Sequence, residues 1–246
     1  MRPVSTDRAG AQDALSDRAE CRDKVYDGGS VIRPADLPSG VGLRVLDVGC
    51  GSGRFAETLS QHGYECYGIT ISSQEAALAK DRMKRVIVGD AEQMSELPFP
   101  AGFFDIVIFS DVLEHLREPR RALELIKPYV RPGGSVVASI PNVANLVVRW
   151  NLLCGRFTYE PSGILDNTHV RFYTKGTAQE LLESAGFMVQ RVTYTNWNWR
   201  LPRRMERLFA FCEWEVRQRM TRWWPGLFAT QFILHATYRS AAPSES

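Results

Sequence analysis

The sequence predicts an α/β fold in which a parallel sheet is covered by helices on both faces. Short apolar runs alternate with segments of helical spacing along most of the chain. The runs are apolar throughout, which is typical of strands buried on both faces, and the first one ends in a glycine-rich turn. Such alternation builds parallel sheets. At 246 residues, 44% of them hydrophobic and 24% charged, the chain is long enough for one domain of this kind.

The first elements are a strand in RVLDVGC at 44–50 and a helix at 55–63 that ends at Gly63. Further elements in chain order are ECYGITI at 65–71, a helix around 73–81, RVIVGD at 85–90, FFDIVIFSD at 103–111, a helix at about 119–130 and SVVASIP at 135–141. Ligands of such sheets bind beyond the carboxyl ends of the strands, so we expect the site there.

The rest of the chain supplies a loop region, a helix and two more strands. Residues 142–172 carry scattered Asn, Gly and Pro without a strand pattern, so we expect a lid or acceptor-binding insertion. A helix begins at Thr174, and strands follow in MVQRVTY at 188–194 and FATQFILHATYR at 228–239, with a basic, aromatic helix at about 200–224 between them. Residues 1–40 are expected to form a polar N-terminal arm and residues 41–240 the domain.

Composition argues against several classes of protein. The net charge is +2 with dispersed Lys and Arg, so we expect no nucleic-acid partner. Five cysteines without a CxxC pair indicate neither a disulfide framework nor a zinc site. The first twenty residues hold no apolar run, and no stretch is apolar enough to span a membrane, so we expect a cytoplasmic protein.

The turn DVGCGSG carries glycines at 49, 51 and 53, which let main-chain N–H groups and a helix start face a ligand. The dinucleotide-binding site of a nicotinamide or flavin protein begins with a similar glycine turn, but its glycines have GxGxxG spacing rather than GxGxG. Asp47 stands two residues before the first glycine. A carboxylate there suits an amino-acid ammonium group better than a pyrophosphate.

The segments VLDVGCGSG, VGDAEQMSELPFPAGFFDIVIFSDVLEHL and LIKPYVRPGGSVVASIPN closely resemble successive motifs of the class I S-adenosylmethionine-dependent methyltransferases. The resemblance covers about residues 45–142 and keeps the family's motif order. It implies a Rossmann-like sheet of seven strands, mostly parallel, whose last strand is antiparallel. It also implies S-adenosyl-L-methionine as the cofactor.

The resemblance further implies which residues bind the cofactor. The glycine turn would line the methionine part, while Asp90 and Ala91 would meet the adenine; capping of the next helix is the alternative role for Asp90. The implied cofactor-binding residues are Asp47, Gly49, Cys50, Gly51, Ser52, Gly53, Thr70, Ile71, Glu75, Asp90, Ala91, Glu92, Ser110 and Leu113.

The ribose position departs from the family pattern. An Asp or Glu usually ends the second strand and holds the ribose hydroxyls, but here Thr70 stands there in YGITISSQE. This resembles the GxTxS variant of cyclopropane-synthase-like members, in which a residue farther along the chain binds the ribose. Gln74 or Glu75 would bind the ribose here.

Of the four histidines, His62 is predicted at a helix end and His235 on a strand, which leaves His115 and His169 as candidate catalytic residues. His169, in the polar cluster DNTHVRFYT, is the preferred general base. Arg171 is a third candidate, with pairing to a carboxylate as its alternative role. A structural hydrogen bond is the alternative for His115.

The phrases SIPNVAN and THVRFYTKGTAQELLESAGF resemble small-molecule methyltransferases, including the O-methylating enzymes of quinone biosynthesis. That resemblance favours O-methylation of a small-molecule, glycoside or sugar-like hydroxyl. A C- or N-methyltransferase, a catalytically silent cofactor-binding module and a dehydrogenase remain alternatives. No motif indicates a metal site, so metal independence is expected.

The segment 196–224 combines five tryptophans with many arginines. It has three interpretations: a helix on a membrane surface, an aromatic wall for the acceptor, or an amphipathic helix packed against the sheet or against a second copy of the chain in a homodimer.

Overall fold

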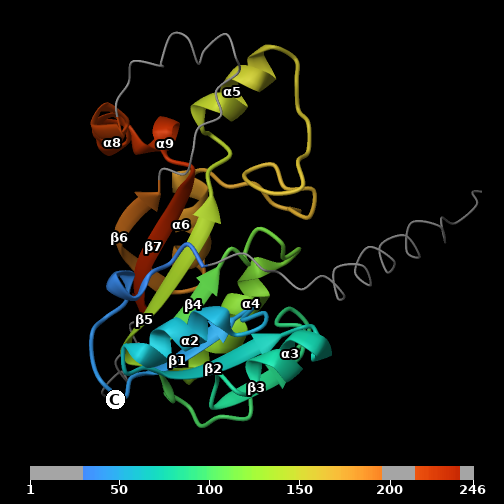
Figure 1. Ribbon diagram of the computed structural model, residues 1–246, viewed down its shortest axis with the longest axis vertical. Coiled ribbons are helices and arrows are strands. Elements are labelled where there is room, and N and C mark those ends of the chain that lie inside the picture. Colours follow the sequence, from blue (N-terminus) through green and yellow to red (C-terminus); the bar gives the residue numbers. More distant parts are fainter. Residues whose placement is uncertain (1–29, 196–213, 239–246) are drawn as a thin grey trace, which may run out of the picture.

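The computed structural model describes residues 30–195 and 214–238, which form one seven-stranded sheet with the order β3-β2-β1-β4-β5-β7-β6 (Figure 1). The strands are β1 (Arg44–Val48), β2 (Glu65–Thr70), β3 (Arg85–Val88), β4 (Phe104–Ser110), β5 (Val130–Pro141), β6 (Phe187–Thr195) and β7 (Gln231–Tyr238). Strands β1 to β5 pair in parallel, and β7 runs antiparallel to both of its neighbours, β5 and β6. The fold class predicted from the sequence is confirmed, including the antiparallel last strand.

Helices lie on both faces of this sheet. The described helical elements are, in chain order, η1 (Pro34–Asp36), α2 (Arg54–Gln61), α3 (Ser73–Ala79), α4 (Pro119–Ile126), η2 (Lys127–Tyr129), α5 (Leu146–Leu153), α6 (Lys175–Ser184), α8 (Trp214–Trp223) and α9 (Pro225–Phe228). Helices α2 and α3 cover one face of the sheet and α4 and α6 the other. Two hydrophobic layers result, one under α4 and α6 and the other under α2 and α3. Alternate residues of β4 enter opposite layers: Ile106 and Ile108 face α2, whereas Val107 and Phe109 face α4.

The described end of the N-terminal arm packs into the core. Ile32 is 1% exposed, and with Leu37 it belongs to the layer under α2 and α3. Residues 1–29, most of the arm, lie outside the described residues, as do residues 196–213 of the aromatic segment. The division of the chain into an arm and a domain stays a prediction. Among the described helices, none has the length and apolar character needed to cross a membrane.

The predicted insertion at 142–172 contains α5 followed by irregular chain. At its start, the buried side chain of Asn142 donates to the carbonyls of Ala229 (2.9 Å) and Gly226 (3.2 Å) and accepts from the N–H of Ala144 (3.0 Å). These bonds tie the end of β5 to the segment that leads into β7. The insertion therefore leaves the sheet from a fixed point.

We expect Asn142→Ala to lower the free energy of unfolding by about 2–3 kcal/mol, because it removes the side-chain donor to the Gly226 carbonyl, one of the two side-chain donors to the buried Ala229 carbonyl, and the acceptor of the Ala144 N–H. Urea unfolding followed by circular dichroism measures this change. Asn167→Ala, at an exposed position of the same insertion, is the control. Equal unfolding midpoints for the two variants would contradict the role given to Asn142.

Candidate functional site

The glycine turn lies between the end of β1 and the start of α2, with positive φ at Gly49 (80°), Gly51 (51°) and Gly53 (75°). The glycines serve different purposes. A Cβ at Gly49 would lie 2.5 Å from Val112 Cγ2, so packing excludes a side chain there. At Gly51 the nearest atom to such a Cβ is a Glu75 carboxylate oxygen, 3.7 Å away. The backbone at Gly51 is therefore open to a ligand beside a carboxylate.

Asp47 lies buried just before this turn. Its side chain is 4% exposed and has no hydrogen-bond donor among the described residues. Burial raises the pKa of Asp47 to about 7. Burial, and then the charges of Asp47 and Glu75, also raise the pKa of the Cys50 thiol. Two buried carboxylates thus lie close to the same cysteine in the turn.

Glu75 reaches the end of β2 from the first turn of α3. Its Oε2 accepts a hydrogen bond from Thr70 Oγ1 at 2.9 Å, and its N–H donates to the N-cap Ser72 Oγ at 3.2 Å. Glu75 is 7% exposed, whereas Gln74 is exposed. Of the two residues that the sequence left open, Glu75 has its carboxylate at the position where the family pattern expects an acid. The side chain of Ile71 is 42% exposed beside it.

Asp90 follows β3 and caps the next turn. Its Oδ1 accepts from the Glu92 N–H (2.9 Å) and its Oδ2 from Gln93 Nε2 (2.8 Å). The described chain has no helix between β3 and β4, so Asp90 caps a turn and not the helix expected there from the sequence. Ala91 is 7% exposed in the hydrophobic layer under α4, and Glu92 accepts from the N–H of Glu118.

The end of β4 contains a residue that sequence reasoning missed. Among the described residues, Asp111 is the only non-glycine with positive φ (53°), a conformation that is strained for most side chains. Its Oδ1 accepts from Ser139 Oγ (3.0 Å) and Gln231 Nε2 (2.8 Å), and burial raises its pKa to about 6. The sequence signal that could have identified Asp111 is its position at the end of a predicted strand, between Ser110 and Val112.

The neighbours of Asp111 differ in their access to a ligand. Ser110 is half-buried, and its Oγ lies 2.8 Å from Ser30 Oγ. Leu113 is fully buried and packs in the core, so its side chain takes part in the fold rather than lining an open site.

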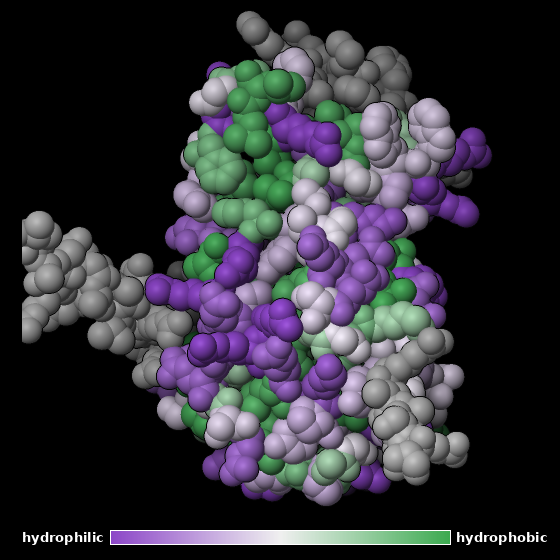
Figure 2. Space-filling model, turned by 180° about the vertical axis from the view of Figure 1, so that it is seen from behind, coloured by the Kyte–Doolittle hydropathy of each residue, from purple (hydrophilic) through white to green (hydrophobic). Residues whose placement is uncertain are grey.

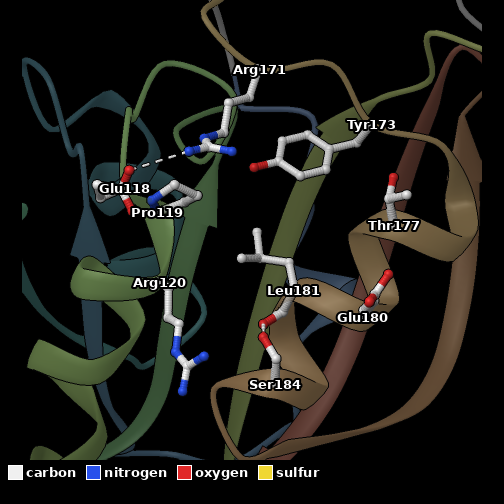
Figure 3. Close-up of a pocket in the computed structure, with 9 residues that line it drawn as sticks. All are labelled: Glu118, Pro119, Arg120, Arg171, Tyr173, Thr177, Glu180, Leu181 and Ser184. Atoms are coloured by element: carbon white, nitrogen blue, oxygen red, sulfur yellow. Dashed lines mark hydrogen bonds and ion pairs between the residues drawn. The ribbon is translucent and has the colours of Figure 1, made fainter.

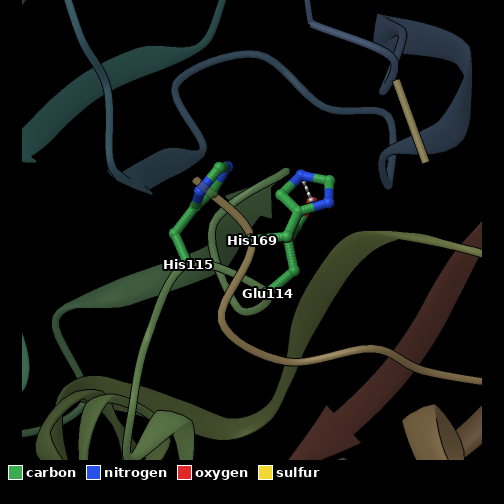
Figure 4. A group of neighbouring side chains, drawn as sticks. All are labelled: Glu114, His115 and His169. Atoms are coloured by element: carbon green, nitrogen blue, oxygen red, sulfur yellow. Dashed lines mark ion pairs between the residues drawn. The ribbon is translucent and has the colours of Figure 1, made fainter. Parts of the chain in front are cut away.

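Glu114, His115 and His169 form a compact cluster beyond β4 (Figure 4). The two imidazole rings are edge to face with their centroids 4.8 Å apart, and His169 Nε2 lies 3.9 Å from Glu114 Oε1. Main-chain bonds join the contributing segments, since the N–H groups of Val170 and Arg171 both donate to the Glu114 carbonyl at 3.0 Å. The structure thus brings the two predicted histidines together and adds Glu114.

Burial dominates the electrostatics of this cluster. It raises the pKa of Glu114 well above its usual range, with the charge of Asp111 as a second cause. It lowers the pKa of both His115 and His169. Both imidazoles are therefore neutral near pH 7, and each retains a nitrogen lone pair.

The side chain of Arg171 lies in a surface hollow between the start of α4 and α6, and no residue of the cluster lines that hollow (Figure 3). Its guanidinium pairs with Glu118 (3.5 Å) and donates to the Arg117 carbonyl (2.7 Å). Arg171 thus makes the carboxylate pairing that the sequence left open. Tyr173, in the same hollow, has a buried hydroxyl without a partner in the described part of the chain, and burial raises its pKa to about 12.

Aromatic side chains of the insertion adjoin His169. The rings of Phe157 and Tyr159 lie 5.9 and 6.4 Å from Phe172, whose centroid is 6.4 Å from that of His169. Phe157 and Tyr159 are about half exposed, at 43% and 52%. Hydrophobic residues also gather on the end of the molecule that holds α5, where Trp150 and Leu153 are exposed (Figure 2).

Comparison with known proteins agrees with this architecture. A family model described as a methyltransferase domain matches residues 18–192. A ubiquinone biosynthesis O-methyltransferase of Coxiella burnetii is 26% identical over 157 residues, which cover 62% of this chain and 66% of that protein. The corresponding Pseudomonas aeruginosa protein is 36% identical over 110 residues, covering 41% of this chain and 45% of that one. The chain thus spans about half to two thirds of the length of these curated relatives.

Solved structures share the fold at low identity. An Archaeoglobus fulgidus S-adenosylmethionine-dependent methyltransferase is 20% identical with a TM-score of 0.54, covering 92% of this chain and 94% of that one. The 1,6-didemethyltoxoflavin-N1-methyltransferase of Burkholderia thailandensis, solved with S-adenosylhomocysteine, is 18% identical with a TM-score of 0.55, covering 98% and 93%. With the family model matched over most of the chain, the glycine turn and the strand order have one explanation: the chain belongs to the methyltransferase-domain family, the class I S-adenosylmethionine-dependent methyltransferases.

Proposed function

We propose that this chain transfers the methyl group of S-adenosylmethionine to a hydroxyl oxygen of a small-molecule acceptor. The observation that carries the proposal is the pair of buried carboxylates, Asp47 and Glu75, which both lie close to Cys50 in the glycine turn, with Glu75 beside the open backbone at Gly51. A ligand with an ammonium group at one end and a ribose diol at the other matches this arrangement of charge.

The bound cofactor supplies a methyl group activated by a positively charged sulfonium. Asp47, which has no donor among the described residues, would accept the cofactor's ammonium group. The Glu75 carboxylate, held in place by Thr70, would accept from both ribose hydroxyls. Asp90 would accept from the adenine amino group, and the Ala91 N–H would donate to the ring.

The acceptor would lie between the cofactor site and the insertion. Phe157, Tyr159 and Phe172 offer an aromatic surface beside His169. His169 would act as the general base for the hydroxyl: its Nδ1–H donates to the Ile164 carbonyl (3.1 Å), so Nε2 carries the lone pair. The resemblance to the ubiquinone biosynthesis O-methyltransferases favours oxygen over nitrogen or carbon as the methyl acceptor.

Membrane contact through the aromatic segment, or a homodimer, stays a prediction. Trp223 and Trp224 are exposed at 85% and 58% at the end of α8, while residues 196–213 lie outside the described residues.

The first experiment is calorimetric titration of the protein with S-adenosylmethionine, S-adenosylhomocysteine and NAD. We expect the first two to bind and NAD not to bind, and a reversed preference would refute the proposal. Acceptor screening with a ¹³C-labelled methyl donor then identifies the acceptor atom, because methoxy, N-methyl and C-methyl carbons have distinct chemical shifts.

We predict that Glu75→Gln weakens binding of S-adenosylhomocysteine by about 10- to 100-fold, because it replaces charge-assisted hydrogen bonds to the ribose with neutral ones. Titration calorimetry measures the change. Gln74→Ala, the adjacent exposed position, is the matched control and should bind like the wild type. Weakened binding in the Gln74 variant alone would assign the ribose to Gln74 instead.

We also predict that the affinity for S-adenosylhomocysteine rises about tenfold between pH 6 and pH 8. With a pKa of about 7, Asp47 is mostly protonated at pH 6 and mostly ionised at pH 8, and only the ionised form pairs with an ammonium group. Dissociation constants measured across this range test the slope. Asp47→Asn should flatten it, and an unchanged slope in that variant would assign the titration to another group.

A further inference from the structure

The carboxylate of Glu114 is the most unusual polar group in the described chain. The residue is 1% exposed, and both carboxylate oxygens are buried without a hydrogen-bond partner among the described residues. A buried carboxylate without partners is costly, so such groups are normally paired or bound to a metal. The nearest basic atom is His169 Nε2 at 3.9 Å, beyond hydrogen-bond distance, on a ring whose pKa is lowered by burial.

The two histidines next to Glu114 are oriented like metal ligands. One ring nitrogen of each bonds a main-chain carbonyl: His169 Nδ1 that of Ile164 (3.1 Å) and His115 Nδ1 that of Thr168 (3.2 Å). Because a carbonyl only accepts, each Nδ1 carries the proton and each Nε2 the lone pair. Histidines that bind a metal through one ring nitrogen almost always donate the N–H of the other nitrogen to a carbonyl, a carboxylate or water.

A further carboxylate, that of Asp166, fixes the position of Thr168 next to His115. Asp166, 4% exposed, accepts hydrogen bonds from the hydroxyl (2.6 Å) and the N–H (2.8 Å) of Thr168. Thr168 is the residue whose carbonyl holds His115. The ring of His115 is therefore fixed by two successive layers of hydrogen bonds.

We propose that Glu114, His115 and His169 bind a divalent ion of the first transition series, such as Mn²⁺, Fe²⁺, Co²⁺ or Zn²⁺. One potential ligand atom from each of the three residues lies within 4.8 Å of the others (Figure 4). Two imidazoles with one carboxylate suit these ions better than Ca²⁺ or Mg²⁺, which prefer oxygen ligands. Three protein ligands also leave coordination positions open for an acceptor.

Binding an ion requires the ligand atoms to move closer together. Ligands about 2.1 Å from one ion stand about 3.0–3.4 Å apart. In the structure the separation is 3.9 Å between Glu114 Oε1 and His169 Nε2, and the ligand atoms of all three residues lie within 4.8 Å of one another. Rotation of the side chains would bring these atoms together. The backbone is already in place, because the N–H groups of Val170 and Arg171 hold the His169 loop on the Glu114 carbonyl.

The role of the ion in the reaction rests on the proposed function. An acceptor hydroxyl bound at an open position would lose its proton to solvent more readily, and its oxygen would attack the methyl carbon as the carbon–sulfur bond breaks. His169 Nε2 would then be a ligand and not the base. The sequence predicted metal independence because no ligand spacing is visible: Glu114 and His115 are adjacent, and His169 lies far along the chain.

Metal binding is tested without cofactor or acceptor, so that the result does not depend on methyl transfer. Protein stripped with EDTA is titrated with MnCl₂, CoCl₂, ZnCl₂ and MgCl₂ by calorimetry, and the Co²⁺ absorption spectrum reports the ligands. We expect one ion per chain, with Mg²⁺ the weakest. Glu114→Gln and His115→Ala should each weaken binding at least about 100-fold, while His235→Ala, on β7, should bind like the wild type.

Binding of S-adenosylhomocysteine by the two cluster variants shows that they are folded. No stoichiometric binding by the wild type, or wild-type binding by both cluster variants, would overturn the metal site. If the protein binds the ion but transfers no methyl group, the metal site stands and the proposed function is refuted. Methyl transfer that persists unchanged in stripped protein without an ion would refute the role of the ion in the reaction and leave His169 as the base.

Discussion

The parallel pairing of β1 with β4 determines where both halves of the site lie. Val48 is in register with Phe109, so the glycine turn and the segment 110–115 leave the sheet side by side at its carboxyl edge. Gly49 has no room for a Cβ because Val112 packs against it. The glycine turn is therefore in contact with the segment that leads to Glu114 and His115, and a shift of one strand against the other would separate the two.

This edge of the sheet concentrates three carboxyl groups, none of which pairs with a lysine or arginine of the described residues. Asp47, Asp111 and Glu114 are all buried enough for their pKa values to rise. Keeping such groups ionised costs stability, and the positive φ of Asp111 adds strain. A cationic ligand lowers the cost of keeping the buried carboxylates ionised. The ammonium and sulfonium of the cofactor and a divalent ion are cations that fit the chemistry of this edge, which links binding to stability.

The sequence predicted the fold because its signals are local. Apolar runs and glycine stops indicated every strand and most helices, and the structure confirms their order. The cofactor turn was equally readable, and Glu75 was one of two residues named for the ribose position. The cluster was not readable as a unit: Glu114 looked like an ordinary polar residue after a strand, and only main-chain bonds from residues 170 and 171 bring His169 to it. Asp111 was missed for the same reason, since its partners Ser139 and Gln231 come from other strands.

Arg171 holds the insertion in position, and its side chain does so without contacting the groups proposed to react. Its N–H bonds the Glu114 carbonyl, while its side chain donates to the Arg117 carbonyl and pairs with Glu118. One residue thus fastens the loop to both ends of the segment 114–118. The exposed ion pair contributes little by itself, but the main-chain bonds fix the path of the loop. His169 and the aromatic residue Phe172 lie on either side of this attachment point, so the group proposed to act on the hydroxyl and the surface proposed to hold the acceptor are positioned by the same contacts.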